Sequence, residues 1–570
     1  MILAAPERIA DYTARGWWGT SPIDDVFRAG VAAHPDRLAV VDPPNRADFT
    51  DGAPRRLTWA ELGDEVGRLA AVLHFAGLRR DDVVAAQLPN LAEYTALYLA
   101  CFRLGIIVTP VPLQFREHEL NHVVSHTGAR AAVTRTRIGK HAHAAMWLAL
   151  RQHLPTLDRV LVFGGDVPDG ATGLDAAMAG STPIATPAPG ITGNDIATIC
   201  WTSGTEAQPK GVPRSHNEWL VIAPSIIESA NLQPGARLLT PSPYVNMAAL
   251  SVNLATWVVI GGTLVHHHPM SLPTMLQQWR DEQVDYCVLP AAVLNKLLQE
   301  PEQLAGIDFR RLRMIGSGGA PLSEWMVRGF HERFGVSIIN HFGSNEGAAL
   351  SSPPADIPDA AARASFYPRA GVPGFNWSVS TLAKIRTRLV DVETGADIDE
   401  VGRAGELRFK GPTIFAGYWN APEMTARAFD DQGYYRTGDL FEIAGDSKQF
   451  YRYTGRAKDL VIRGGMNISS EEIEALVLGH PDVAEAAVVG WPDAIMGEKV
   501  CVFVAPRPGA TVTLPDLVRF LKEEKRVAMY KLPEHLVLID VLPRNPVGKI
   551  LKRELRERVK ALAEPGPAAA

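Results

Sequence analysis

Thr202–Gly211 reads TSGTEAQPKG, a stretch of glycine, hydroxyl residues and one lysine that directly follows the apolar run Ile196–Trp201. Its hydroxyls and backbone N–H groups can turn toward an anion, and Lys210 adds a positive charge at the far end. The common P-loop, GxxxxGK[ST], has its lysine opening a helix, whereas here Pro209 and Gly211 flank the lysine. We therefore predict a buried strand followed by a flexible phosphate-binding loop. A plain surface turn is the alternative for this stretch taken alone.

Composition limits the class of protein. The chain has 570 residues, 46% of them hydrophobic, and a net charge of −6, so it can bury large cores and gives no electrostatic argument for a nucleic-acid partner. The four cysteines lie far apart and form neither a zinc motif nor a disulfide framework. No leader-like segment and no apolar run of membrane-spanning length is evident. We expect a soluble, cytoplasmic protein without a membrane span and of unknown oligomeric state.

The order of hydrophobic segments predicts alternating helices and strands. Thr58–Glu61 reads as a capping box that opens a helix with apolar residues at helical spacing, ending near Gly77. The expected strands that follow are Val83–Gln87, Ala131–Thr134, Arg159–Phe163, Gly262–Val265, Asp285–Leu289 and Met314–Ser317. This rhythm indicates an α/β fold with stacked α/β layers and largely parallel sheets.

The rhythm changes in the C-terminal third. Asp391–Phe409 is expected to form a β-rich subdomain, with a hairpin in LVDVETGADI and a strand in AGELRFKG. Beyond Gly455 we expect a smaller α/β unit, with elements at Ser470–Leu478, Glu485–Val489, Val500–Ala505, Leu514–Glu524 and His535–Leu538. The Ala/Pro/Gly tail is expected to be flexible.

Five further motifs follow the glycine loop. They are GSGGAPLS at Gly316–Ser323, HFGSNEG at His341–Gly347, YYRTGD at Tyr434–Asp439, GRAKDLVIRGG at Gly455–Gly465, and PVGKILKREL from Pro546. In this order they resemble the superfamily of adenylate-forming enzymes, which includes acyl-CoA synthetases and aryl-acid AMP ligases, over roughly Thr58–Leu555. The resemblance implies an adenylation domain at 1–457, a small mobile C-terminal domain at 458–560 and a tail at 561–570.

The resemblance also implies a set of roles. The residues expected to bind ATP are Thr202, Ser203, Gly204 and Thr205 on the glycine loop, Gly318, Gly319, Ala320, Pro321, His341 and Phe342 around the base, and Asp439 and Arg456 at the ribose. Glu346 would hold Mg²⁺, a hard cation that prefers oxygen ligands. Lys210, Asn345 and above all Lys549 would act on the phosphates, Lys549 by neutralising charge as the carboxylate meets the α-phosphate. A solvated lysine is the alternative for Lys549.

Two steps share the implied active site. A carboxylate attacks the α-phosphate of ATP to give acyl-AMP and pyrophosphate, and a thiol then attacks the acyl carbon and expels AMP. The superfamily switches between the steps by rotating the C-terminal domain about a hinge, here Lys458. Rotation would withdraw Lys549 and bring Gly464 and Gly465 alongside the pantetheine arm of coenzyme A.

Two motifs depart from the usual superfamily pattern. Glu206 and Ala207 replace the usual threonine and glycine, so a carboxylate stands near the expected triphosphate. Asn345 replaces a threonine whose hydroxyl normally faces the α-phosphate; its amide can donate a hydrogen bond instead.

The acid is expected to bind at Pro241–Ser251, with candidate pocket residues Tyr244, Asn246, Met247, Gly343 and Ala348. Met247 offers no polar partner and Gly343 leaves space, so we expect an apolar acid that is medium-chain, alicyclic or simple aromatic. Ordinary core packing is the alternative for Met247. Coenzyme A is the expected acceptor because no carrier-protein unit follows the C-terminal domain. A separate carrier protein as acceptor, and a non-catalytic relative that only binds nucleotide or acid, are the two alternatives.

Two histidine groups offer weaker hypotheses. His118–His122 matches HExxH, which on a helix can bind zinc, but the longer pattern of such proteases is missing. His266–His268 follows an apolar run, and adjacent residues of an extended segment point to opposite sides. We expect neither group to bind a metal.

Overall fold

The structure is a computed structural model of the chain. It describes residues 1–202, 209–319, 321–456, 459–463, 466–493, 496–525, 527, 529–545 and 548–563. Within these ranges, no helix combines the length and apolarity needed to cross a bilayer. The chain forms two compact units: the first holds Met1–Thr202, Gln208–Arg386 and Phe409–Tyr435, and the second holds Thr387–Arg408 and Arg436 onward.

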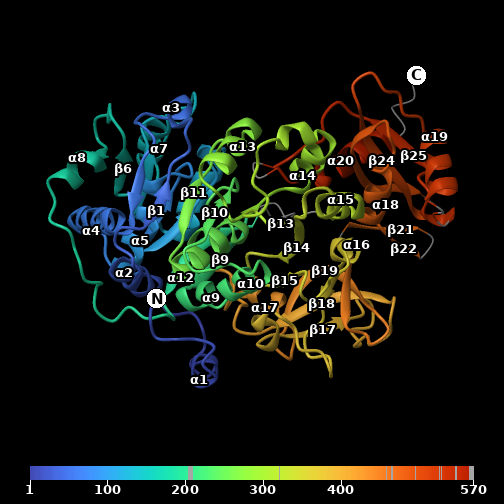
Figure 1. Cartoon of the computed structure of the whole chain (residues 1–570), viewed down its shortest axis with the longest axis horizontal. Helices are drawn as coiled ribbons and strands as arrows, with labels where there is room; N and C mark the ends of the chain where they lie inside the picture. The colour runs from blue at the N-terminus through green and yellow to red at the C-terminus, as the bar shows by residue number, and fades with distance from the viewer. Residues whose placement is uncertain are drawn as a thin grey trace. The chain divides into compact units, whose positions relative to one another are not determined.

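A seven-stranded sheet in the first unit contains the two strands that precede and follow the glycine loop in the sequence (Figure 1). Its strands, in spatial order, are β7 (Thr172–Gly173), β6 (Arg159–Phe163), β5 (Ala131–Arg135), β3 (Val83–Ala86), β4 (Ile107–Pro110), β8 (Ile196–Trp201) and β9 (Gly211–Ser215). All neighbours are parallel except β8 and β9. The strand predicted before the glycine loop is confirmed as β8, and the loop returns into a strand rather than a helix.

An eight-stranded sheet forms the other half of this unit. Its strands, in spatial order, are β15 (Ala349–Ser351), β14 (Ser337–Gly343), β13 (Met314–Gly318), β12 (Tyr286–Val288), β10 (Arg237–Thr240), β11 (Thr263–His266), β1 (Leu38–Val41) and β2 (Arg56–Thr58). Only the edge pairs β14–β15 and β1–β2 are antiparallel. The predicted largely parallel sheets are confirmed, with strand ends that differ by one or two residues.

Helices separate the two sheets and cover their outer faces. Val84 and Ala86 pack into a core shared with α2 (Ile23–Ala33), α4 (Trp59–Phe75) and α5 (Ala92–Leu104), whereas Val83 and Ala85 pack into the opposite core. That alternation is the period of two that a strand buried on both faces requires. The capping box is confirmed, because the Thr58 hydroxyl accepts from the Glu61 N–H and the Glu61 carboxylate accepts from the Thr58 N–H.

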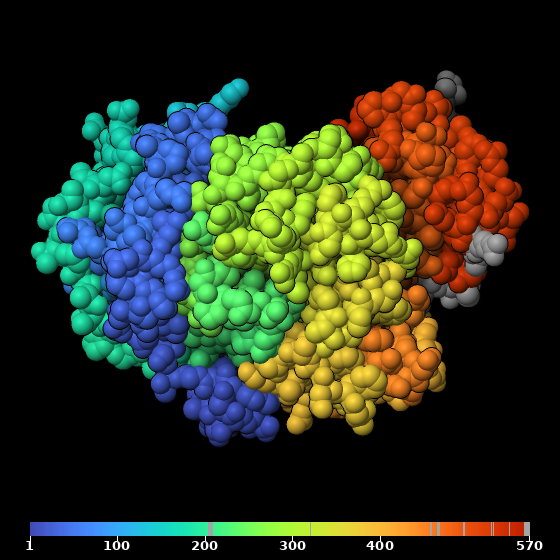
Figure 2. Space-filling view, in the orientation of Figure 1, coloured from blue at the N-terminus to red at the C-terminus, as the bar shows by residue number. Residues whose placement is uncertain are grey.

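Further helices complete this unit. They are α1 (Pro6–Ala14), α3 (Arg46–Phe49), α6 (Glu117–Thr127), α7 (His143–Arg151), α8 (Leu174–Ala179), α9 (His216–Leu220), α10 (Ala223–Ser229), α11 (Met247–Leu250), α12 (Trp257–Ile260), α13 (Leu272–Asp281), α14 (Ala291–Gln299), α15 (Glu324–Phe334), α16 (Ala360–Ser365) and α17 (Pro422–Ala428). A π-helical stretch, Ser251–Thr256, joins α11 to α12. Figure 2 shows the N-terminal segment in dark blue at the surface, beside green residues of the same unit.

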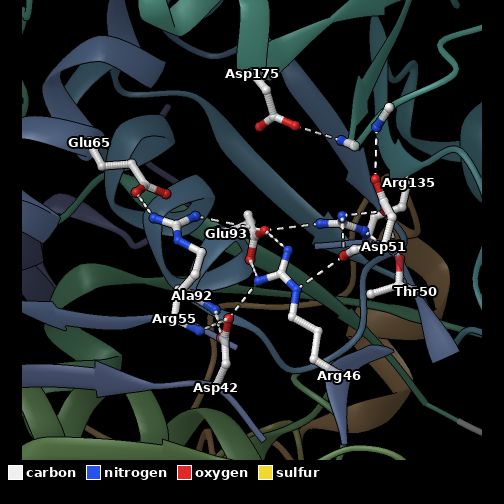
Figure 3. A network of polar contacts seen from close by, with 12 residues as sticks. Asp42, Arg46, Thr50, Asp51, Arg55, Glu65, Ala92, Glu93, Arg135 and Asp175 are labelled. Atoms are coloured by element: carbon white, nitrogen blue, oxygen red, sulfur yellow. Dashed lines mark hydrogen bonds and ion pairs between the residues drawn. The ribbon is translucent and has the colours of Figure 1, made fainter. Parts of the chain in front are cut away.

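A buried ionic network ties the two sheets together (Figure 3). The Glu93 carboxylate at the start of α5 accepts hydrogen bonds from Arg46, 2.5 Å away, and from Arg135 at the end of β5, 3.0 Å away. Arg46 also bonds Asp42, which follows β1, at 2.5 Å. Because β1 and β5 belong to different sheets, this network fixes the sheets to one another at their carboxyl ends.

The second unit contains the predicted β-rich segment. Strands β20 (Phe450–Arg456), β19 (Tyr435–Ala444), β18 (Ala404–Lys410) and β17 (Arg386–Val390) follow one another across a sheet. The strand expected in AGELRFKG is β18. The expected hairpin in LVDVETGADI is wrong in part: β17 ends at Val390, and a single bridge from Val390 to Asp397 replaces the second arm.

The C-terminal part of this unit is a small α/β layer. Its strands are β21 (Leu460–Arg463), β22 (Met466–Ser469), β23 (Val483–Asp493), β24 (Gly497–Pro506) and β25 (His535–Leu538), and its helices are α18 (Ser470–Val477), α19 (Leu514–Arg519) and α20 (Lys552–Ala563). The helix expected to run to Glu524 becomes π-helical after Arg519. The predicted fold class, α/β with a large sheet-containing part and a small C-terminal part, is confirmed.

Candidate active site

The FGSNEG motif forms a tight turn between β14 and β15. Ser344 N–H donates to the Ala348 carbonyl and Gly347 N–H donates to the Ser344 carbonyl, each at 3.0 Å. Gly347 has φ +102°, and a Cβ there would stand 1.8 Å from the Thr413 carbonyl oxygen. Only glycine fits this position. The turn therefore holds Asn345 and Glu346 against the segment around Thr413.

Glu346 lies at the tip of this turn and is only 6% exposed. The Tyr418 hydroxyl donates to its Oε1 at 3.0 Å, and its backbone carbonyl accepts from Phe415 N–H at 2.9 Å. A carboxylate held this way suits a hard divalent cation, because such ions prefer oxygen ligands. The residues present thus fit the Mg²⁺ that the motif implies, and the metal-binding role stays a prediction.

Lys210 lies near the same tyrosine. Its Nζ is 5.3 Å from the centroid of the Tyr418 ring, over the ring face. Its backbone closes the base of the glycine loop, since Thr202 N–H donates to the Lys210 carbonyl at 3.0 Å and Lys210 N–H approaches the Thr202 hydroxyl at 3.4 Å. The structure therefore brings Lys210 and Glu346 together at Tyr418, which the sequence reasoning did not identify, while Thr202 is bonded to the Lys210 backbone.

A buried guanidinium supports the turn from behind. Arg214, at the end of β9, is fully buried and donates to the carbonyls of Asn345 at 3.0 Å and Glu218 at 2.8 Å. Burial lowers the pKa of Arg214, and burial also raises the pKa of Glu218. Arg214 was missed by the sequence reasoning. Its place in the sequence PRSHNEW (residues 213–219), which begins within β9, was the available signal.

Asn345 links the nucleotide motif to the predicted acid pocket. Its Oδ1 accepts from Met247 N–H at 2.8 Å, and its Nδ2 donates to the Trp201 carbonyl at 3.2 Å. Met247 is the first residue of α11 and is 7% exposed. Asn246 caps the same helix by accepting from Ala249 N–H at 3.2 Å. One side chain thus holds the end of β8 and the start of α11 at the FGSNEG turn.

The remaining candidate pocket residues differ in exposure. Gly343 is exposed, and a Cβ there would meet only the Ala348 carbonyl, at 3.6 Å. Ala348 itself is fully buried. Tyr244 is 1% exposed, packs against Tyr98, and donates to the Asn253 carbonyl at 3.0 Å. Neither Tyr244 nor Ala348 offers appreciable side-chain surface to a ligand, whereas the backbone of Gly343 is exposed.

The predicted base pocket lies across β13 and β14. Gly318 pairs with His341, and a Cβ on Gly318 would stand 2.1 Å from the His341 carbonyl oxygen. The His341 ring lies between the Tyr286 hydroxyl at 2.9 Å and the Ser351 hydroxyl at 2.8 Å. Burial lowers the pKa of His341 to about 4, so this ring is neutral near pH 7. It therefore acts here as an uncharged link between strands.

The other base-pocket residues lie nearby on the same strands. Gly319 and Pro321 are exposed just after β13. The Phe342 ring is half-buried and has Phe409 and Tyr367 as ring neighbours, at 6.3 and 6.4 Å. Phe342 is therefore partly exposed on β14, the strand next to the edge strand β15.

The second unit contains the two predicted ribose ligands side by side. Asp439 on β19 stands opposite Arg456 on β20, and Arg456 Nε lies 2.8 Å from Asp439 Oδ1. Burial alone would lower the pKa of Arg456, but Asp439 together with Tyr453, Asp459 and Glu471 outweighs it and raises that pKa. The Arg456 guanidinium therefore orients the Asp439 carboxylate.

Lys549 lies at the end of a short turn in the same unit. Lys549 N–H donates to Asn545 Oδ1 at 2.8 Å, and the Lys549 carbonyl accepts from Asn545 N–H at 2.8 Å. Arg544 and Ile550 form an antiparallel bridge on either side. The predicted residues Ser203, Gly204, Thr205, Ala320, Lys458, Gly464 and Gly465, with Glu206 and Ala207, lie outside the described residues.

The histidines of the weaker hypotheses have other partners. His122 lies on α6, the helix that carries HExxH, and its Nε2 is 3.2 Å from the Pro209 carbonyl oxygen. In the second group His266 contacts Thr95 and His267 contacts Gln278. Over the described part of the chain, no group of three or more possible ligands is arranged to hold a metal ion.

Comparison with known proteins defines the class. The AMP-binding enzyme family matches residues 27–419, and the AMP-binding enzyme C-terminal domain matches residues 472–549. The medium-chain fatty-acid–CoA ligase of Escherichia coli (strain K12) is 31% identical, over 97% of this chain and 93% of that protein. A salicylyl-CoA synthase / salicylate adenylyltransferase of a Streptomyces species is 29% identical, over 98% of each.

Solved structures agree. The ATP-bound structure of MatB from Rhodopseudomonas palustris matches with a TM-score of 0.78 at 28% identity, over 95% of this chain and 100% of that one. The chain therefore belongs to the AMP-binding enzyme family. The motif order predicts membership of the adenylate-forming superfamily, and this prediction is confirmed.

Proposed function

We propose that this AMP-forming acid–CoA ligase activates an apolar carboxylic acid, medium-chain, alicyclic or simple aromatic, as acyl-AMP and transfers the acyl group to coenzyme A. ATP is the proposed nucleotide, consistent with the ATP-bound relative of the same fold. The relatives named for medium-chain fatty acids and for salicylate support the substrate class. Their identity of about 30% leaves the particular acid open.

The hydrogen bond from Met247 N–H to Asn345 Oδ1 carries this proposal. It places a nearly buried thioether beside the turn that bears Glu346, so the acid would meet the nucleotide next to an apolar side chain. A buried apolar wall favours a hydrocarbon group over a charged one, because a charged group there would lose its hydrogen bonds to water. The open space at Gly343 favours an acid larger than acetate.

The protein's own groups account for the first step. The acid carboxylate attacks the α-phosphorus, the bond to the bridging oxygen breaks, and pyrophosphate leaves. Lys210 and Thr202 at the base of the glycine loop stabilise the leaving phosphates, and Lys549 neutralises the charge of the two approaching anions. Glu346 would hold Mg²⁺, which when bound offsets the charge of the triphosphate. Asp439 and Arg456 hold the ribose.

The second step uses the same centre. The coenzyme A thiolate attacks the acyl carbon, the acyl–phosphate bond breaks, and AMP leaves. We place the adenylation domain at 1–457 and the mobile C-terminal domain at 458–560, with the hinge at Lys458 and the thiol approach at Gly464 and Gly465. Rotation of the C-terminal domain then lets one site serve both steps.

A panel of carboxylates tests this function. Purified protein is incubated with ATP, Mg²⁺, coenzyme A and single acids: straight-chain acids of increasing length, cyclohexane acids, benzoates, amino acids and dicarboxylates. We expect AMP and the acyl-CoA in equal amounts for the apolar members only. Preference for an amino acid or a dicarboxylate would reject the proposed substrate class.

Two readouts separate the alternatives. If pyrophosphate is released with an acid but thioester appears only on a phosphopantetheinylated carrier protein, the acceptor is a carrier protein. If no acid in a broad panel releases pyrophosphate while the protein still binds ATP, the chain is a non-catalytic binding protein.

A further inference from the structure

We propose that Tyr418 is a positioning residue of the adenylation step, which sets the orientation of the Glu346 carboxylate and of the Lys210 ammonium at once. This inference rests on the proposed function. Tyr418 belongs to the segment between β18 and α17. Its role would be to hold the two charged groups that meet the metal and the phosphates.

The geometry separates two functions of one side chain. The hydroxyl donates to Glu346 Oε1 at 3.0 Å, while the ring face lies 5.3 Å from Lys210 Nζ. A donor on one carboxylate oxygen fixes the carboxylate plane and directs the other oxygen toward an incoming cation. A cation over an aromatic face is attracted by the ring quadrupole. The hydroxyl thus acts on the anion and the ring acts on the cation.

Tyr418 can act this way because its backbone is fixed on both sides. Tyr418 N–H donates to the Thr425 hydroxyl at 2.9 Å, and Trp419 N–H donates to the Gly211 carbonyl, also at 2.9 Å. Gly417 has φ +153°, and a Cβ there would stand 2.5 Å from Thr425. Gly211 directly follows Lys210, and Trp419 directly follows Tyr418. The bond between Trp419 and Gly211 therefore fixes the backbone of Tyr418 relative to that of Lys210.

The N-terminal segment holds the preceding residues of this loop. Arg8 on α1 donates to the carbonyls of Phe415, at 3.1 Å, and Ile414, and lies 3.5 Å from the buried Glu218 carboxylate. Trp18 Nε1 donates to the Pro412 carbonyl at 3.1 Å. Phe415 N–H in turn donates to the Glu346 carbonyl. The loop and the FGSNEG turn are therefore one connected frame, and Tyr418 connects the two side chains that face the substrate.

Three variants test the role. Tyr418→Phe removes the hydroxyl and keeps the ring, and Tyr418→Leu removes both. Tyr451→Phe is the matched control, because it also removes one tyrosine hydroxyl bond, to Thr387 at 2.9 Å, in the second unit. Binding of Mn²⁺ to the full-length enzyme in the presence of ATP is followed by electron paramagnetic resonance. Binding of AMP without metal, and the melting temperature, are measured alongside.

We expect Tyr418→Phe to weaken Mn²⁺ binding to the enzyme–ATP mixture by about tenfold, with AMP binding and the melting temperature close to wild type. Tyr418→Leu should weaken Mn²⁺ binding at least as much and also weaken metal-free ATP binding, because Lys210 loses its ring. Tyr451→Phe should leave Mn²⁺ binding unchanged.

Two results would overturn the role of Tyr418: wild-type Mn²⁺ affinity in Tyr418→Phe, or parallel losses of AMP binding and melting temperature, which would indicate packing alone. Failure of the wild-type enzyme to bind Mn²⁺ with ATP would overturn the proposed function as well. A normal wild type with an unaffected Tyr418→Phe variant would overturn only the role of Tyr418.

Discussion

The fully buried guanidinium of Arg214 donates a hydrogen bond at 3.0 Å to the carbonyl of Asn345, the residue that precedes Glu346. It also lies 3.9 Å from the Glu218 carboxylate, which is buried as well. A buried charge that loses its partner is costly to keep in the protein interior. The FGSNEG turn therefore depends on a charge pair that never meets the substrate.

Arg214→Met is expected to lower the free energy of unfolding by about 3–5 kcal/mol, because it leaves Glu218 without this partner and the Asn345 carbonyl without a donor. Urea unfolding of the intact protein measures the loss. The double variant Arg214→Met/Glu218→Gln should recover part of it, since the uncompensated charge is gone. Equal stability of Arg214→Met and wild type would contradict the assignment.

Asn345→Ala is expected to raise the KM of the acid by about tenfold, because the N–H of Met247 and the carbonyl of Trp201 lose their partner and α11 loses its attachment to the turn. The comparison variant is Asn246→Ala, which removes the cap of the same helix at a cost of about 1 kcal/mol but leaves the turn intact. Initial rates with the preferred acid measure both. A larger effect for Asn246→Ala would show that the helix start matters more than its link to Asn345.

Lys549→Ala is expected to slow formation of acyl-AMP by about a hundredfold or more, because the charge of two approaching anions is no longer offset. Thioester formation from supplied acyl-AMP and coenzyme A should remain close to wild type. Lys560→Ala, an exposed lysine of α20 paired with Glu557 at 3.0 Å, serves as control and should leave both steps unchanged. Equal loss of both steps in Lys549→Ala would argue against alternation of the C-terminal domain.

Glu93→Gln is expected to destabilise the protein by about 3–5 kcal/mol near neutral pH, since the buried guanidiniums of Arg46 and Arg135 lose their shared carboxylate. Burial alone would raise the pKa of Glu93, but Arg46, Arg135 and Arg55 outweigh it and lower that pKa to about 2. Asp42, a neighbouring carboxylate bonded to Arg46, opposes ionisation.

The sign of the pH dependence follows from that lowered pKa. The stabilisation by Glu93 is complete above the pKa of an unfolded glutamate, about 4.3, and is lost as the pH falls through about 2. The stability difference between wild type and Glu93→Gln should therefore shrink as the pH is lowered. A difference that stays constant between neutral and acid pH would show that Glu93 is not ionised in the folded protein.

Local signals in the sequence predicted the elements well. The Thr58–Glu61 capping box and the apolar run Ile196–Trp201 are short-range patterns, and both became the expected helix start and strand. The hairpin expected after Val390 was only partly formed, because turn residues mark where a chain reverses but not how far pairing continues. The roles that the motif order assigns to the candidate nucleotide residues stay predictions.

Contacts between distant positions could not be predicted in the same way. Tyr418 reaches Glu346 across 72 positions and Arg214 reaches Asn345 across 131. Neither partner carries a periodic or turn-forming pattern, and a tyrosine after a glycine is an ordinary surface residue by composition. Only the packing of the two sheets and the loop after β18 shows that these side chains meet.

The attachment of Arg8 and Trp18 to the loop before Tyr418 bears on how this enzyme should be produced. The family match begins at residue 27, so a shortened protein cut there would retain every recognised motif and yet lack three donors to the carbonyls of residues 412–415. Such a fragment would also lose the first turn of α2, with the buried pair Asp24–Arg103. We expect it to be less stable than the full chain and to bind metal more weakly.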